Sequence, residues 1–131
     1  MDKIYIDDIG DGGAKHDKFE RDVKLLTQGL IDEPNNVRYV FYLAQTLKDV
    51  GKIKESIKMY KKRISMGGWI EEVWYSHYMI GKLWLKLNNP EKFEYWMNRA
   101  YKCRKERAEP IYELTKYFRE VGQQIKSYHY Y

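Results

Sequence analysis

Apolar residues recur every three to four positions along most of this chain, which is the spacing of one face of an α-helix. The stripes predict helices at about residues 17–31, 36–49, 53–66, 70–87, 90–104 and 108–121, with a short one from 124. Pro90 follows Asn88 and Asn89, an arrangement typical of a capped helix start. Gly51 and Gly122 suit the left-handed position that ends a helix. The pattern therefore predicts an all-α chain.

Three of these helices share a motif. It consists of an apolar residue, a small residue directly after it, a large apolar residue three positions later, and Gly or Asn four positions after that. The sets are Leu43-Ala44-Leu47-Gly51, Ile80-Gly81-Trp84-Asn88 and Leu114-Thr115-Phe118-Gly122. The small positions lie 37 and 34 residues apart, and the glycines of "SMGGW" are the plausible place for the three extra residues.

This motif resembles the tetratricopeptide repeat (TPR), a helix–turn–helix unit of about 34 residues. The unit around Gly81 matches best, with Phe93, Met97 and Ala100 in the second-helix places. Residues 17–34 match the second helix of a half-unit. The resemblance implies a TPR-like α-α superhelix of about seven helices, in which each repeat packs only on its neighbours. We expect an extended N-terminal arm at residues 1–16 and the repeat domain at 17–131.

In TPR arrays the first helix of each unit lines a concave groove. The resemblance places these residues there: Arg38, Phe41, Gln45, Lys48, Tyr75, Tyr78, Lys82, Leu85, Glu109, Tyr112, Lys116 and Arg119. Tyrosine rings beside lysine and arginine suit a sugar, a phosphate or an extended acidic peptide. The alternative is that about half of the tyrosines only pack against neighbouring helices. The groove lacks the Lys/Asn set with which chaperone-binding members hold a terminal carboxylate.

Charge is unevenly distributed along the chain. The net charge is +5, with −3 on residues 1–22 and +8 on residues 23–131. A basic helical body could attract nucleic acid, acidic lipids or phosphorylated ligands, but lysine-rich helices are more often simply solvated. The densest basic run, "KMYKKR", is short and no base-reading motif is present, so nucleic acid is an unlikely partner. No apolar run is long enough to span a membrane.

Few other residues could act in catalysis, in metal binding or in a disulfide bond. The single cysteine, Cys103, cannot form an internal disulfide, and the first residues lack a secretory signal, so we expect a cytoplasmic protein. His16, His77 and His129 lie far apart, and His77 falls on a buried-facing position. Neither a nucleophilic arrangement nor a metal site of Cys and His is expected, and no cofactor is implied.

The opening stretch "IYIDDIGDGG" does not fit the repeat. Its first three residues suit the end of a strand, and "GDGG" is a turn signal. Asp17 with Glu20 resembles a capping box that begins a helix. Asp7, Asp8 and Asp11 could bind a divalent cation, although such a loop is more often a solvated turn.

A more specific resemblance covers nearly all of residues 11–121. The blocks are "DGGAKHDKFERDVKLL", "RYVFYLAQTLKDVGK", "YKKRISMGGWIEE" and "RAEPIYELTKYFRE". They are similar to the C-terminal region of a group of family 2 glycosyltransferases, in which a nucleotide-sugar-binding GT-A domain comes first. Such an enzyme needs a DxD motif for its metal ion and a carboxylate base, and this chain contains no DxD.

The resemblance implies that the opening stretch is the edge of a catalytic domain that this chain does not contain. The junction signature would be Asp11, Gly12, Gly13, Lys15, Asp17, Lys18 and Arg21. Lys15 and Lys18 could approach phosphate or sugar hydroxyls. Equally, Lys18, Arg21 and Asp22 could form local ion pairs that fix the junction.

Two further blocks leave the same choice open. Trp69 could pack as a hydrophobic staple, with Glu71 and Glu72 favourably placed in the first helical turn. Alternatively, these three residues offer a sugar-stacking platform at the groove mouth. In "RAEP", Arg107 and Glu109 are either a structural bracket or a groove contact.

We therefore expect a non-catalytic TPR-like module that binds an acceptor, either glycan or protein, or a partner enzyme. The alternatives are a free-standing protein–protein scaffold and an accessory subunit that completes a glycosyltransferase site in trans, with a GT-A domain as its partner. The aromatic C-terminal residues would leave apolar surface at the end of the array, so oligomers are possible.

Overall fold

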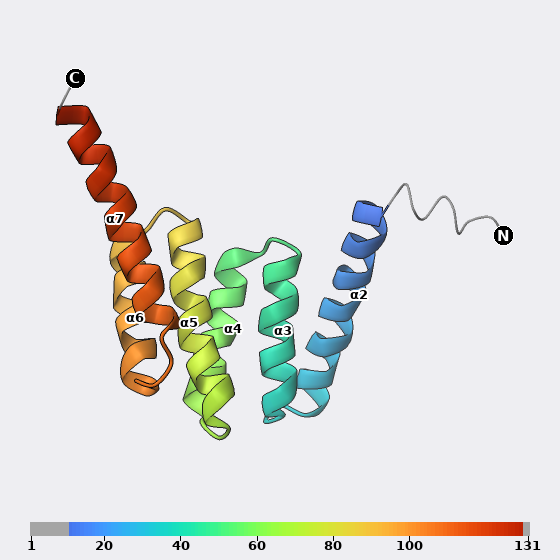
Figure 1. Ribbon diagram of the computed structural model, residues 1–131. Coiled ribbons are helices and arrows are strands. Elements are labelled where there is room, and N and C mark those ends of the chain that lie inside the picture. Colours follow the sequence, from blue (N-terminus) through green and yellow to red (C-terminus); the bar gives the residue numbers. More distant parts are fainter. Residues whose placement is uncertain (1–10, 130–131) are drawn as a thin grey trace. The chain divides into compact units, whose positions relative to one another are not determined.

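The computed structural model describes the backbone of residues 11–129 and the side chains of residues 17–122. Within this range every regular element is an α-helix (Figure 1). The helices are α2 (Asp11–Asp32), α3 (Val37–Asp49), α4 (Ile53–Met66), α5 (Ile70–Lys86), α6 (Pro90–Cys103) and α7 (Glu109–His129). None of the described helices is both long and apolar enough to cross a membrane. The predicted all-α class is confirmed.

The chain divides between Met66 and Gly67 into two compact units. In the first unit α3 and α4 form a helical hairpin and α2 packs on α3. In the second unit α5 and α6 form a hairpin and α7 packs on α6. Within residues 11–129, each unit therefore shows one complete helical pair and one additional helix.

In both hairpins the first helix ends at a residue in the left-handed conformation. After α3, Gly51 has a φ of 88°, and the N–H of Lys52 donates to the carbonyl of Leu47 at 2.9 Å. After α5, Asn88 takes the same left-handed position with a φ of 61°, and the N–H of Asn89 donates to the carbonyl of Trp84 at 2.9 Å. These bonds satisfy carbonyls that a helix end leaves without partners. The helix end predicted at Gly51 is confirmed.

Asparagine side chains cap the starts of α3 and α6. Asn36 accepts a bond from the N–H of Tyr39 at 3.1 Å at the start of α3. Asn89 does the same for Lys92 at the start of α6, where Pro90 takes the first helical position as predicted. Such caps each stabilise a helix by about 1 kcal/mol.

Small residues allow the helices of each unit to approach closely. In the first unit, a Cβ atom on Gly29 of α2 would lie 2.9 Å from the ring of Tyr39 on α3. The hydroxyl of Ser56 on α4 donates to the carbonyl of Ala44 on α3 at 2.7 Å, and both residues are buried. In the second unit, a Cβ atom on Gly81 would lie 3.1 Å from the terminal methyl of Met97.

Two helix ends differ from the prediction. The first helix begins at Asp11 instead of residue 17, so Asp17 lies inside α2 and does not cap it. The last helix continues through Gly122 to His129, so the helix end predicted at Gly122 and the separate helix from 124 are wrong. The predicted strand end, with Asp7 and Asp8, lies outside the described residues.

The different roles of two glycines give a direct test. Gly51→Ala should lower the free energy of unfolding by about 1 kcal/mol, because alanine is strained at positive φ. Gly122→Ala should raise it by about 0.5–1 kcal/mol, because alanine is the better helix former and nothing lies within 4 Å of the added methyl. Urea denaturation of the two variants measures both changes. A loss of stability in Gly122→Ala would contradict the continuous α7.

Candidate functional site

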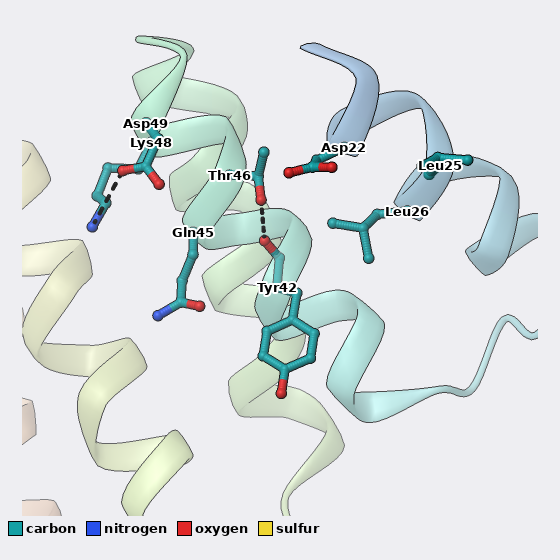
Figure 2. Close-up of a pocket in the computed structure, with 8 residues that line it drawn as sticks. All are labelled: Asp22, Leu25, Leu26, Tyr42, Gln45, Thr46, Lys48 and Asp49. Carbon is teal, nitrogen blue, oxygen red and sulfur yellow. Dashed lines mark hydrogen bonds and ion pairs between the residues drawn. The ribbon is translucent and has the colours of Figure 1, made fainter. Parts of the chain in front are cut away.

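A hollow of the first unit lies between α2 and α3 and has a volume of about 520 Å³ (Figure 2). Three residues of α2 and five of α3 line it: Asp22, Leu25, Leu26, Tyr42, Gln45, Thr46, Lys48 and Asp49. Figure 2 shows Asp22 and Leu26 pointing from α2 toward α3, with Leu25 on the outer side of α2. We call this feature the α2–α3 hollow.

The lining combines apolar and polar groups. Leu25 is 70% exposed and Tyr42 is 40% exposed, so both side chains are available for contact. The hydroxyl of Thr46 donates to the carbonyl of Tyr42 at 2.9 Å. The Nζ of Lys48 lies 3.9 Å from the Oδ1 of Asp49. Arg38 donates to the Tyr42 hydroxyl at 3.0 Å and so orients this ring. The hollow can therefore bury an apolar side chain and offer hydrogen bonds around it.

The groove positions predicted on α3 have different surroundings. Gln45 and Lys48 line the hollow, and Arg38 contacts Tyr42 at its edge. Phe41 is only 8% exposed and lies edge-on to the ring of Tyr60, with 6.1 Å between centroids. It is a core residue, so its predicted place in the groove is wrong.

In the second unit the predicted groove residues of α5 form an aromatic cluster. The ring of Tyr78 stacks on buried Trp74 at 5.3 Å, and the ammonium group of Lys82 lies 5.4 Å from the Tyr78 centroid. The ring centroid of Tyr75 lies 6.4 Å from that of Trp74 and 6.5 Å from that of Tyr78. The Tyr78 hydroxyl donates to Glu113 of α7 at 2.9 Å. Burial, followed by this carboxylate, raises the pKa of Tyr78 well above its usual value.

The predicted groove residues of α7 are mostly exposed. Tyr112 is 59% exposed, and Lys116 and Arg119 are also exposed. A hollow of about 100 Å³ lies beside them, lined by Leu85, Glu113, Lys116, Tyr117 and Glu120. The phenol of Tyr78 and the side chain of Leu85 thus connect α5 to the same stretch of α7.

The blocks "GGWIEE" and "RAEP" meet in an ionic cluster of the second unit. Glu71 of α5 accepts hydrogen bonds from Arg104 and, at 2.9 Å, from Arg107. Arg107 also pairs with Glu109 at 3.0 Å, and its guanidinium lies 4.1 Å from the Trp74 centroid. The Arg107 hydrogen bond lowers the pKa of Glu109. Of the two interpretations of "RAEP", this geometry favours the structural bracket.

Trp69 and Glu72 have contrasting environments. Trp69 precedes α5 and is 58% exposed, so it is not a buried staple on that helix. Its carbonyl accepts the N–H groups of Glu72 and Val73 at 3.1 and 3.2 Å, which begins the helix. The side chain of Glu72 is buried. Only Trp69 of these two offers its side chain to a ligand.

The predicted junction residues all lie on α2. Asp11, Gly12, Gly13 and Lys15 form its first turns, where the structure describes the backbone alone. Asp17, Lys18 and Arg21 are exposed further along the helix. A role of these residues beside a donor or acceptor stays a prediction.

His77 and Cys103 share a shallow hollow of about 300 Å³ with Arg99 and Lys102. His77 is buried, as predicted, and its Nδ1 donates to the carbonyl of Val73 at 2.9 Å. Burial lowers the pKa of His77, and burial raises the pKa of the Cys103 thiol. Among the described side chains, no three His, Cys, Asp or Glu residues are grouped as a metal site would require.

Sequence reasoning missed the hollow-lining residues Asp22, Leu25, Leu26, Tyr42, Thr46 and Asp49. Their signal was present in the half-unit predicted at residues 17–34. The second helix of a repeat buries part of its apolar surface against the first helix, and no described helix takes that place beside α2. The exposed Leu25 is the residue that this argument would have identified.

The helical pairs, their joints and their spacing place this chain in the class of TPR-like helical-repeat proteins. Comparison with solved structures shows this fold. The N-terminal domain of stress-induced protein-1 (STI-1) from C. elegans superposes with a TM-score of 0.71 at 16% identity, over 86% of this chain and 91% of that one. Two crystal structures of MamA give TM-scores of 0.66 and 0.67 at 23% and 22% identity. They cover 95% and 90% of this chain, and 66% and 67% of theirs.

No protein-family model matches the sequence, and no curated protein matches it. The structural similarities therefore define the fold of this chain and not its partner. The predicted TPR-like fold is confirmed.

Proposed function

We propose that this chain is a binding module whose α2–α3 hollow accepts an amphipathic helix of a protein partner. The observation that carries the proposal is a correspondence between the two units. The repeat motif places α7 in register with α3 at an interval of 71 residues, the interval between Leu43 and Leu114. In this register Tyr42, Gln45, Thr46 and Asp49 correspond to Glu113, Lys116, Tyr117 and Glu120.

The corresponding surface of the second unit is covered by a helix. There α5 places Tyr78 against Glu113, and Leu85 completes the small hollow of about 100 Å³. In the first unit, no described helix takes the equivalent place, and the hollow is about 520 Å³. A partner helix that docks in the way that α5 docks in the second unit would fill the larger hollow of the first unit.

The surface of α2 supports the same reading. In register, Leu25 corresponds to Trp96 and Leu26 to Met97. On α6, Trp96 packs against His77 of α5 with 5.7 Å between ring centroids, and Met97 packs against Gly81. Leu25 is exposed because no described helix of the first unit lies where α5 lies in the second. Helix-in-groove recognition uses apolar anchors of this kind.

A peptide of residues 70–86, the sequence of α5, is the direct probe of this proposal. Labelled peptide titrated with the full chain should bind with a dissociation constant of roughly 10–100 μM, because ordering a free peptide costs about 2–5 kcal/mol. Fluorescence anisotropy measures the binding. Leu25→Glu should weaken it about tenfold, since an apolar anchor contributes about 1.5–3 kcal/mol.

Ile31→Glu is the matched control for this experiment. Ile31 is 67% exposed on the same helix but does not line the hollow, so its replacement should leave binding unchanged. Equal loss in both variants, or no binding by the parent chain, would refute the hollow as a helix site.

A second candidate is binding of a glycan acceptor, favoured by the exposed Trp69 in the block "GGWIEE". The kinship with the C-terminal region of family 2 glycosyltransferases, and a role beside a GT-A domain in trans, rest on the sequence blocks alone. Several block residues have packing roles, since Tyr60 and Arg63 are fully buried. Titration of labelled oligosaccharides against the chain and against Trp69→Ala would separate this candidate from helix binding. The cytoplasmic location likewise stays a prediction.

A further inference from the structure

We propose that the helix that fills the α2–α3 hollow is α7 of a second copy of the chain, so that copies join head to tail. The inference rests on the proposed function of the hollow and names its occupant. It follows from the surface that α7 leaves uncovered within its own unit.

The repeat register relates α7 to α5 at an interval of 34 residues. Three residues of α5 contact α6 and correspond to three residues of α7. On α5 they are His77, Gly81 and Trp84, and on α7 they are Ile111, Thr115 and Phe118. His77 and Gly81 are buried, whereas Ile111 is 41% and Phe118 is 49% exposed, and Thr115 is also exposed. The described part of α7 thus presents the surface that the first helix of a repeat uses to bind its second helix.

The contacts of α5 with α6 predict the contacts of α7 with α2 of another copy. His77 packs against Trp96, Gly81 against Met97, and Lys92 lies 4.2 Å from the Trp84 centroid. Carried over in register, these pairs become Ile111 with Leu25, Thr115 with Leu26, and Phe118 with Arg21. The first is an apolar contact that would cover two exposed side chains. The last pair repeats the cation–π contact between Lys92 and Trp84, with the cation again on the second helix and the ring on the first helix of the repeat.

Charge complementarity supports the same occupant on the α3 side. Leu85 of α5 lies in the small hollow beside Tyr117 and Glu120 of α7. In register, Leu85 corresponds to Arg119, and Glu120 corresponds to Asp49. A docked α7 therefore brings the Arg119 guanidinium to the Asp49 carboxylate, and both residues are exposed in the single chain.

The two surfaces belong to different helices, so the contact is heterologous and each copy can bind two neighbours. Sedimentation velocity of the full chain should show a mass above the 15.9 kDa of one copy that rises with concentration. Leu25→Glu removes the hollow's anchor, and Phe118→Lys replaces the ring of α7 by a cation that Arg21 of the next copy would repel. Each variant alone should remain a single copy at every concentration. Ile31→Glu should associate like the parent chain.

Mixing the two variants gives the decisive result. Phe118→Lys retains an intact hollow and Leu25→Glu retains an intact α7, so the mixture should form one-to-one dimers and nothing larger. A charge swap adds a second check, in which Asp49→Arg and Arg119→Asp each reduce association at least fivefold and together restore it. Circular dichroism confirms that each variant is folded.

Three outcomes would overturn the inference: a parent chain that stays a single copy, variants that still dimerise alone, or a mixture that does not combine. The peptide of residues 70–86 separates this failure from failure of the helix site. If that peptide binds while the chain stays monomeric, the hollow binds a helix of a different protein, such as a catalytic partner.

Discussion

Phe93→Ala is expected to lower the free energy of unfolding by about 3–5 kcal/mol, the range for removing a fully buried phenylalanine. Phe93 is 0% exposed and forms the core of the second unit with Met97 and Leu114. Its ring lies edge-on to Tyr117 at 5.4 Å, so this helix–helix contact is lost as well. Because α6 contacts both α5 and α7 through this core, the cavity weakens the whole unit. Urea denaturation followed by circular dichroism measures the loss.

Phe118→Ala is the matched control, since it removes the same side chain from an exposed position on α7. Phe118 is 49% exposed, so its loss should change the stability of the single chain by less than about 1 kcal/mol. Comparable losses in the two variants would contradict the packing of α6 described above. The measurement belongs at low protein concentration, where copies do not associate.

Arg107→Ala is expected to lower the free energy of unfolding. The guanidinium bonds Glu71 at 2.9 Å and Glu109 at 3.0 Å and lies over Trp74. Hydrogen bonds between charged groups are stronger than those between neutral groups, although solvent screening weakens them at partly exposed sites. The cation–π contact with Trp74 adds to the stabilisation. Arg107→Lys should recover only part of the loss, because lysine lacks the planar group that spans two carboxylates.

The pH dependence of this effect has a definite sign. Arg107 lowers the pKa of Glu109, so the unfolded state binds more protons over the carboxyl range and stability falls on acidification. The pairing is fully present above the unfolded pKa of about 4.3 and is lost as pH falls through the lowered folded pKa. The difference between the parent chain and Arg107→Ala should therefore shrink at acidic pH. Lys105→Ala, at an exposed residue of the same loop, should show no such difference.

The hairpins could be predicted because local signals and tertiary packing agree there. Gly51 ends α3 and Asn89 with Pro90 begins α6, and the buried stripes of both pairs follow helical periodicity. Gly122 shows why the prediction failed at the end of the chain. Gly51 ends α3 in the left-handed conformation, and α4 then returns to pack on α3 through the Ser56 bond to Ala44. No described helix returns after Gly122, and the helix continues.

The candidate site was harder to predict from the sequence, because a hollow stays open only where no other helix covers the surface. Gln45 and Lys48 were identified as groove positions, but Phe41 turned out to be buried against Tyr60. Repeat positions specify which way a side chain faces relative to its own helix. They do not specify how far a neighbouring aromatic ring reaches. Glu71 shows the same limit, since its partners Arg104 and Arg107 lie more than thirty residues away.

The distribution of the tryptophans between the two units has a spectroscopic consequence. All four tryptophans, at positions 69, 74, 84 and 96, follow the division between Met66 and Gly67. Indole emission therefore monitors only the second unit, whereas the far-ultraviolet helix signal monitors both. If the two signals change at different denaturant concentrations, the halves of this chain melt separately, and a single optical probe would overlook one of them.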